Sequence, residues 1–224
     1  CDSNIYIITV PTPVDINKKP NLKFLFEATR TVGLNLNSGD IVIYESTVYP
    51  GCTEQECVPI LEKISNLKFN KDFYCGYSPE RINPGDKVNT VKSIKKIVSY
   101  DDCPKIIKNK IRQVYKSISD NIVITNSIEN AEMSKVIENI QRDINIAFMN
   151  EIFMLCKKLN LNFIEVIKLA RTKWNFLNFS PGLVGGHCLP VDPFYLYDVA
   201  QRKGHEAKFM LAGRRVNNEL EFFL

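Results

Sequence analysis

The chain has 224 residues, of which 45% are hydrophobic and 24% are charged, and its formal net charge is +4. This composition is typical of a globular protein of one or two domains and excludes a disordered chain. The lysines are scattered along the sequence, which argues against a nucleic-acid surface. No apolar run approaches the roughly 18 residues of a membrane span. The seven cysteines lack the spacing of a zinc site or a disulfide framework, so we expect a reduced, cytoplasmic protein without a metal.

The first half of the chain alternates strands and helices. Strands are expected at residues 5–10, 41–44, 73–77, 95–99 and 122–125, and helices at about 22–32, 53–64 and 104–116. Thr53 and Glu56 have the spacing of a capping box at the start of the second helix. Strands separated by helices of this length imply parallel pairing in a doubly wound α/β domain.

Polar residues follow three of these strands. Thr12 comes after the first strand, Ser46 and Thr47 after the second, and Glu80 and Arg81 after the third. In doubly wound sheets, ligands bind beyond the carboxyl ends of the strands. We therefore expect the three segments to form walls of one crevice, although each of them alone would be an ordinary loop.

One long helix is expected from about residue 129 to residue 159, because this stretch contains no glycine or proline. At 100° per residue, Lys135, Asn139 and Arg142 fall in one narrow sector, opposite an apolar side. That apolar side contains Ile137, Ile140, Ile144 and Phe148. Two cations in the polar sector would suit an anionic ligand. The alternative is an exposed helix end.

Further helices are expected at about residues 163–172, 194–202 and 206–221. Between the first two, residues 174–182 carry aromatic, amide and hydroxyl side chains without a regular period, which indicates a binding loop. Arg214 and Arg215 in the last helix would face a ligand, a partner subunit or water, and the pattern does not decide among these.

A cysteine with unusual neighbours lies near the end of that loop, in the segment Gly185-Gly186-His187-Cys188-Leu189-Pro190-Val191-Asp192-Pro193. Glycines allow close approach of a ligand, and Asp192 and Pro193 suit the cap and first position of the next helix. A helix N-terminus or a cation lowers the pKa of a thiol, so Cys188 is a candidate nucleophile. The alternative is a buried structural cysteine. The other cysteines are expected to be inert.

Five motifs occur in the order found in UDP-sugar 6-dehydrogenases, and the chain resembles this family nearly from end to end. They are Val10-Pro11-Thr12-Pro13, Glu45-Ser46-Thr47-Val48-Tyr49-Pro50-Gly51, Ser78-Pro79-Glu80-Arg81, Lys135-x-x-x-Asn139 and the segment around Cys188. Residues 142–147 and 176–182 resemble the branch that acts on UDP-N-acetylglucosamine, -mannosamine or -galactosamine.

The resemblance implies a partial Rossmann-like doubly wound sheet followed by an all-helical central domain like that of 6-phosphogluconate dehydrogenase. Residues 1–127 would be the C-terminal part of an NAD-binding domain, and residues 128–224 a central domain that forms a homodimer through the long helix. The sequence begins with Cys1 and contains no GxGxxG. We therefore expect a piece that lacks both ends, including the UDP-binding domain, and that binds NAD and nucleotide poorly.

The resemblance also implies a four-electron oxidation of the sugar C6 alcohol to a carboxylate by two NAD molecules, through a thiohemiacetal and a thioester on Cys188. Lys135 and Asn139 would stabilise oxyanions, and Asp192 would orient Lys135 or the hydrolytic water. Glu80 and Thr47 would share acid–base work. The nicotinamide would contact Thr12, Ser46 and Thr47. The UDP-sugar would contact Glu80, Arg81, Lys135, Asn139, Arg142, Phe176, Asn178, Ser180 and Gly185.

Each role has a structural alternative. Asp192 could serve only as a helix cap, Thr47 as a strand-end hydroxyl and Glu80 as a partner of Arg81. The alternatives for the whole protein are a UDP-glucose 6-dehydrogenase, a dehydrogenase that performs a single two-electron step, and a non-catalytic fragment or degenerate paralogue.

Overall fold

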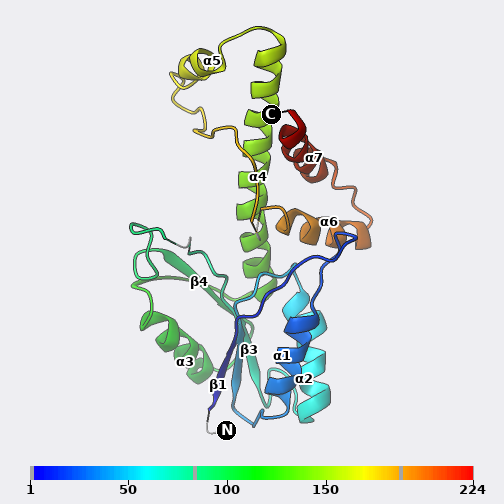
Figure 1. Ribbon diagram of the computed structural model, residues 1–224. Coiled ribbons are helices and arrows are strands. Elements are labelled where there is room, and N and C mark those ends of the chain that lie inside the picture. Colours follow the sequence, from blue (N-terminus) through cyan, green and yellow to red (C-terminus); the bar gives the residue numbers. More distant parts are fainter. Residues whose placement is uncertain (1–2, 83–84, 187–188, 224) are drawn as a thin grey trace. The chain divides into compact units, whose positions relative to one another are not determined.

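The computed structural model describes residues 3–82, 85–186 and 189–223. The chain divides into two compact units, residues 1–136 and residues 137–224 (Figure 1). Within the described ranges, no helix combines the length and the apolar character that crossing a membrane requires. The same residues contain no group of three or more His, Cys, Asp or Glu side chains that could hold a metal ion.

A five-stranded sheet forms the centre of the first unit, with its strands in the order β1-β2-β3-β4-β5. Three of them, β1 (Ile5–Ile8), β2 (Ile41–Tyr44) and β3 (Tyr74–Tyr77), are parallel. In contrast, β4 (Lys95–Tyr100) runs antiparallel to β3, and β5 (Asn121–Thr125) is parallel to β4. The α/β class is confirmed, but the prediction of an entirely parallel sheet is wrong at the β3–β4 pair. Parallel neighbours need a crossover connection, usually a helix, and the described residues between β3 and β4 form none.

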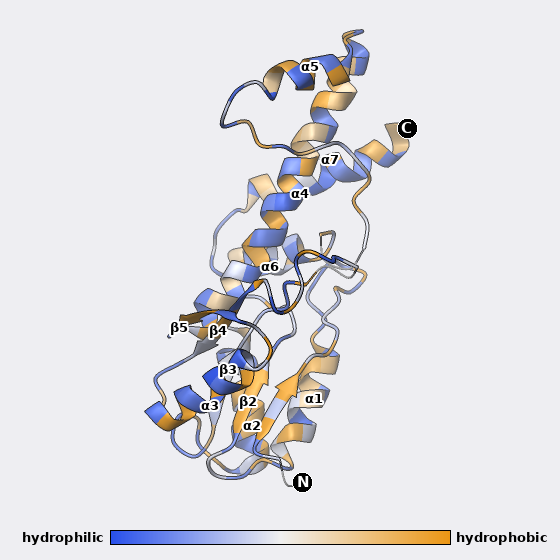
Figure 2. Ribbon diagram, turned by 90° about the vertical axis from the view of Figure 1, so that its left-hand side faces the viewer, coloured by the Kyte–Doolittle hydropathy of each residue, from blue (hydrophilic) through white to orange (hydrophobic). Residues whose placement is uncertain are grey.

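Helices cover both faces of this sheet. Two of them, α1 (Lys23–Gly33) and α2 (Val58–Ser65), lie on one face, and α3 (Lys105–Lys116) lies on the other (Figure 1). All four residues of β2 are buried, as a continuous apolar strand between two helical layers should be (Figure 2). The buried side chains of α3 are Ile107, Ile111 and Tyr115, which recur every four residues and pack against β2, β3 and β4.

The connection after β2 differs from the predicted capping box. A π-helical turn, η1 (Thr53–Cys57), leads into α2, and its N-cap residue Cys52 makes no side-chain capping bond. Thr53 is inside the turn, and its hydroxyl donates to Glu132 (2.6 Å). Glu56 accepts a hydrogen bond from the Tyr49 hydroxyl (2.9 Å). The capping-box prediction is therefore wrong, because both side chains bind partners outside the first turn.

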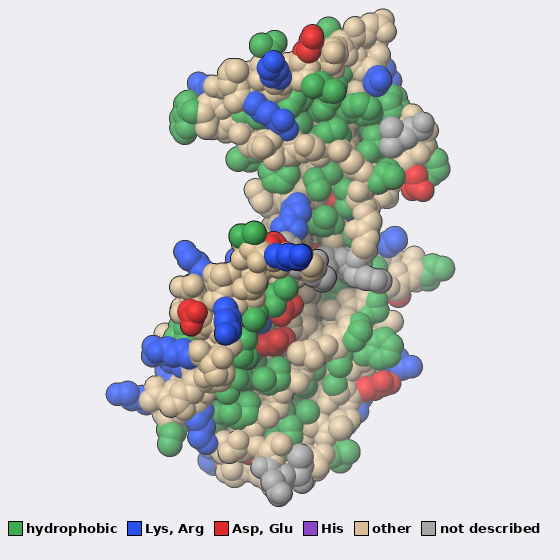
Figure 3. Space-filling model, turned by 60° about the vertical axis from the view of Figure 1, so that its left-hand side comes forward, with side chains coloured by type: hydrophobic (Ala, Val, Ile, Leu, Met, Phe, Trp, Pro, Cys, Tyr) green, Lys and Arg blue, Asp and Glu red, His purple; other side chains and the backbone are tan. Residues whose placement is uncertain are grey.

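The second unit is helical. It contains most of α4 (Ile128–Lys158), together with α5 (Phe163–Ala170), α6 (Asp192–Arg202) and α7 (Lys208–Phe223). Asn162 caps α5, because its side chain accepts from the N–H groups of Ile164 and Glu165. Asp192 was expected to cap α6, but it is the first residue of that helix, Val191 is the N-cap, and Pro193 is therefore second. Figure 3 shows lysine and arginine side chains interspersed with hydrophobic and acidic ones on the face it draws.

Replacement of Gly76 by alanine should destabilise the sheet, because a Cβ on this β3 residue would lie 2.9 Å from the backbone oxygen of Ser99. That oxygen moves only with β4, so we expect a loss of roughly 1–3 kcal/mol in the free energy of unfolding. Chemical denaturation measures the loss. Gly185→Ala is the control, since a Cβ there meets no atom within 4 Å. Equal losses in the two variants would contradict the explanation.

Candidate active site

The loops that follow β1 and β2 are connected by side-chain hydroxyl groups. The Thr12 hydroxyl donates to the backbone oxygen of Thr47 (2.6 Å), and the Ser46 hydroxyl donates to the backbone oxygen of Val10 (2.7 Å). Both bonds cross from one strand end to the next. The structure thus brings together Thr12, Ser46 and Thr47, as expected for residues at the carboxyl ends of adjacent parallel strands.

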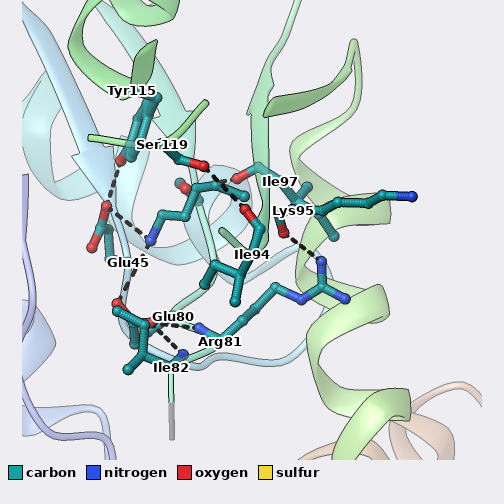
Figure 4. A network of polar contacts seen from close by, with 11 residues as sticks. Glu45, Glu80, Arg81, Ile82, Ile94, Lys95, Ile97, Tyr115 and Ser119 are labelled. Carbon is teal, nitrogen blue, oxygen red and sulfur yellow. Dashed lines mark hydrogen bonds and ion pairs between the residues drawn. The ribbon is translucent and has the colours of Figure 1, made fainter. Parts of the chain in front are cut away.

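Glu80 is connected to the β2 loop by a buried cation (Figure 4). Its Oε1 accepts hydrogen bonds from the backbone N–H groups of Arg81 and Ile82, both 2.6 Å long. Its Oε2 lies 3.7 Å from the Lys96 ammonium, which also lies 3.5 Å from a carboxylate oxygen of Glu45. The Arg81 guanidinium donates to the backbone oxygen of the neighbouring β4 strand at Lys95 (2.8 Å).

Tyr115 completes this group of contacts from α3. Its hydroxyl donates to Glu45 Oε1 (2.6 Å), and its ring centroid lies 5.7 Å from the Lys96 ammonium. Burial raises the pKa of Tyr115 well above its usual value, and the nearby Glu45 carboxylate raises it further. The phenol therefore stays protonated and acts as a donor.

A second buried carboxylate binds the turn that follows Thr47. Glu132, near the start of α4, is fully buried and accepts three hydrogen bonds. The donors are the Gly51 N–H (2.6 Å), the Thr53 N–H (2.9 Å) and the Thr53 hydroxyl (2.6 Å). Burial raises the pKa of Glu132 to about 7, although these donors oppose the shift. Glu132 was not predicted from the sequence, although its place seven residues before Asn139 puts it in the same helical sector.

In the second unit, two amide side chains of α4 bind other segments. Asn139 donates to an Asp192 carboxylate oxygen (2.6 Å), and both side chains are buried. Asn150 accepts from the Gly182 N–H (2.8 Å) and donates to the Gly182 carbonyl (3.1 Å). Two predicted site residues, Asn139 and Asp192, are therefore in contact, although the sequence did not predict this pairing, and the predicted binding loop is anchored at Gly182. Asn150 was not singled out from the sequence.

A buried ion pair connects α7 to α4. The Arg214 guanidinium donates to an Asp143 carboxylate oxygen (2.6 Å), and Asn217 donates to the same oxygen (2.8 Å). Burial raises the pKa of Asp143, and Arg214 opposes the shift. The sequence left Arg214 open between a ligand, a partner and water. The structure assigns it to the interior, whereas Arg215 is exposed.

The other predicted residues differ in exposure. Lys135 and Phe176 are half-buried, whereas Arg142, Asn178, Ser180 and Gly185 are exposed. Cys188 and its neighbour His187 lie outside the described residues. The described cysteines, Cys52, Cys57, Cys75, Cys103 and Cys156, are free and buried. Burial raises the pKa of the Cys75 thiol well above its usual value, which disfavours a thiolate there.

Both units match domains of one family. Residues 1–119 match the NAD binding domain of the UDP-glucose/GDP-mannose dehydrogenase family, and residues 129–219 match its central domain. The chain belongs to this family. The Rossmann-type sheet and the helical central domain that the resemblance implied are thereby confirmed.

Two relatives in this dehydrogenase family are about half identical to the chain. The UDP-N-acetyl-D-glucosamine 6-dehydrogenase of Salmonella typhi is 53% identical over 220 residues, which cover 98% of this chain and 51% of the relative. The enzyme of the same name from Pseudomonas aeruginosa is 52% identical over 216 residues, which cover 96% of this chain and 51% of the relative.

A solved structure agrees with the fold of the whole chain. The UDP-D-ManNAc dehydrogenase of Pyrococcus horikoshii superposes with a TM-score of 0.88 at 35% identity, over 99% of this chain and 52% of that one. The chain thus spans about half the length of the relatives it matches.

The strand ends of this family member carry the residues that the sequence predicts for the nicotinamide end of NAD. The Ser46 hydroxyl directs its proton to a backbone carbonyl, so its oxygen can accept a hydrogen bond from a donor such as a carboxamide N–H. Thr47, the next residue, is half-buried.

The raised pKa of Glu132 predicts a pH-dependent contribution to stability. Folding favours the neutral form, so this contribution is fully present below the ordinary value of 4.5 and is lost as the pH rises through about 7. We expect wild type to lose up to about 3 kcal/mol relative to Glu132→Gln between about pH 5 and about pH 8. Thermal unfolding at both pH values measures the difference. Glu151→Gln, at an exposed position of α4, is the control and should show no such pH dependence.

Proposed function

We propose that the protein containing this chain is an NAD-dependent UDP-N-acetylhexosamine 6-dehydrogenase. It oxidises the C6 alcohol of the sugar to a carboxylate in two two-electron steps, and the uronic acid serves as a precursor of surface polysaccharide. The observation that favours an N-acetylhexosamine over UDP-glucose is the 53% and 52% identity to UDP-N-acetyl-D-glucosamine 6-dehydrogenases. In this proposal residues 1–127 form the NAD-binding part and residues 128–224 the central domain.

Cys188 is the proposed nucleophile. Its thiolate adds to the aldehyde carbon of the half-oxidised sugar and gives a thiohemiacetal, whose oxidation gives a thioester that water hydrolyses to the acid. The burial of all five cysteines in the described part of the chain supports Cys188, because none of them is open to a substrate. Thr12, Ser46 and Thr47 would hold the nicotinamide of NAD, which would supply the hydride acceptor for each of the two oxidations.

Lys135 and Asn139 are the proposed oxyanion donors. The hydrogen bond from Asn139 to Asp192 supports this role, because it fixes the orientation of the amide and leaves its second N–H for a substrate oxygen. Lys135 supplies a positive charge that a tetrahedral oxyanion needs. Asp192 orients this pair and the hydrolytic water.

Glu80 and Thr47 share the proposed acid–base work on that water and on the C6 oxygen. The remaining substrate contacts are proposed for side chains that the structure leaves accessible, or for glycine backbone. They are Arg81, Arg142, Phe176, Asn178, Ser180 and Gly185. Arg81 and Arg142 would neutralise phosphate charge, and the other four would contact the sugar and its ring substituents.

A homodimer through α4 is part of the proposal. An apolar groove on this helix supports it, with Ile137 46% exposed and Phe148 55% exposed. Phe148→Glu is expected to shift the protein to a monomer, because it places a charge in an apolar interface core. Sedimentation velocity measures the state. Leu34→Glu, at an exposed apolar position outside the groove, is the control, and a dimer that survives Phe148→Glu contradicts the proposed interface.

The stoichiometry of NADH tests the proposed reaction in the full-length protein. We expect two NADH per UDP-N-acetylglucosamine, -mannosamine or -galactosamine consumed, and little turnover of UDP-glucose. Cys188→Ser should form at most one NADH per sugar and release no acid, because the thioester is not made. Cys156→Ser, at a buried position, is the matched control and should keep the wild-type stoichiometry.

Other results would assign a different function. One NADH per sugar with an unaffected Cys188→Ser variant would indicate a single two-electron oxidation and a structural Cys188. Faster turnover of UDP-glucose than of any N-acetylhexosamine would indicate a UDP-glucose 6-dehydrogenase. A protein that forms no NADH with any of the four sugars would be non-catalytic.

A further inference from the structure

The antiparallel pairing of β3 and β4 brings Lys96 next to Glu80. The last pair of this ladder joins Tyr77 to Ser99. If the register continues for three more residues, Glu80 lies across from Lys96. The Ser78 hydroxyl donates to the backbone of β4 (2.6 Å), which keeps the two segments together beyond the last pair. A parallel β4 would not make this contact.

Lys96 is a buried cation between two carboxylates. Its side chain is 3% exposed, and its ammonium lies 3.5 Å from Glu45 and 3.7 Å from Glu80 (Figure 4). A lysine is almost never buried unless it is paired. The Tyr115 hydroxyl donates a hydrogen bond to Glu45 and so fixes this carboxylate. Glu45 in turn contacts the Lys96 ammonium on its buried side, and Glu80 contacts it on the side nearer to solvent.

The two carboxylates differ in their access to solvent. The Glu45 side chain is 15% exposed, whereas that of Glu80 is 48% exposed. Two backbone N–H groups bind one oxygen of Glu80, and Lys96 pairs with the other. Glu80 is therefore anchored at both oxygens and still accessible. An acid–base group needs this combination, because its proton must reach a substrate or water from a fixed position.

We propose that Lys96 is a positioning residue for Glu80, and that Glu45 and Tyr115 act through Lys96 to fix the acid–base carboxylate. The proposal rests on the proposed function, in which Glu80 takes part in proton transfer. Lys95 provides a matched control, since it is the preceding residue of β4 and its side chain is exposed.

A double-mutant cycle in the full-length protein tests this proposal by kinetics. Lys96→Met should lower kcat about tenfold or more with a smaller effect on KM, and Lys96→Arg should restore most of the loss. In a Glu80→Gln background, Lys96→Met should change kcat by less than about twofold, because its effect passes through the carboxylate. Lys95→Met should be neutral. Equal losses in both backgrounds would overturn the proposal and leave the proposed function intact.

Hydrogen exchange provides a readout that does not depend on activity. The amides of Arg81 and Ile82 donate to Glu80, so a fixed carboxylate protects them. Lys96→Met should raise their exchange rates about tenfold or more, whereas Lys95→Met should not. Unchanged rates in Lys96→Met would overturn the proposal. If Lys96→Met raises these exchange rates but the wild-type protein oxidises no UDP-sugar, the contact between Lys96 and Glu80 is supported and the proposed function is rejected.

Loss of folding in Lys96→Met is a separate outcome, because the substitution leaves two carboxylates without their cation. In that case Lys96→Met is combined with Glu45→Gln, which removes the more buried of the two charges. The kinetic cycle and the exchange measurement are then made in the Glu45→Gln background, where the same results support or overturn the proposal.

Discussion

Three buried polar side chains of α4 form hydrogen bonds with the segments that carry the candidate site. A carboxylate or amide that loses water costs free energy unless it is hydrogen-bonded. In the first unit, Glu132 binds the turn that follows Thr47. In the second unit, Asn139 binds the start of α6, and Asn150 binds the loop that leads toward Cys188. Each contact therefore fixes the backbone next to a residue with a proposed chemical role.

The mixed sheet has a related consequence for the chemistry of the first unit. Because β4 runs against β3, a side chain of β4 lies beside the residues that follow the carboxyl end of β3. A chain of contacts then leads from the interior to the surface, from Tyr115 to Glu45, Lys96 and finally Glu80. Charged groups in such a network support one another, and each loses its geometry when a neighbour is removed.

Local patterns were sufficient to predict most elements of the fold. The helix expected at about residues 104–116 is α3, and the strand expected at residues 41–44 is β2. Sequence patterns predicted the wrong hydrogen-bond partner where a polar side chain had two possible partners. Thr53 was expected to cap its own helix and Asp192 to cap α6, but Thr53 binds Glu132 and Asp192 binds Asn139. Both alternatives satisfy the same hydrogen-bonding groups, so the sequence does not choose between them.

By itself, the sequence determined the helices and strands, the order of the motifs and the family to which they belong. These follow from the periodicity of neighbouring residues and from contiguous segments. Only the tertiary structure decided the direction of β4, the burial of Arg214 and the partners of Glu132 and Lys96. Glu132 binds Gly51 across 81 positions, and Asn139 binds Asp192 across 53. Packing chooses such distant partners, because a buried polar group binds whichever matching group the fold places within reach.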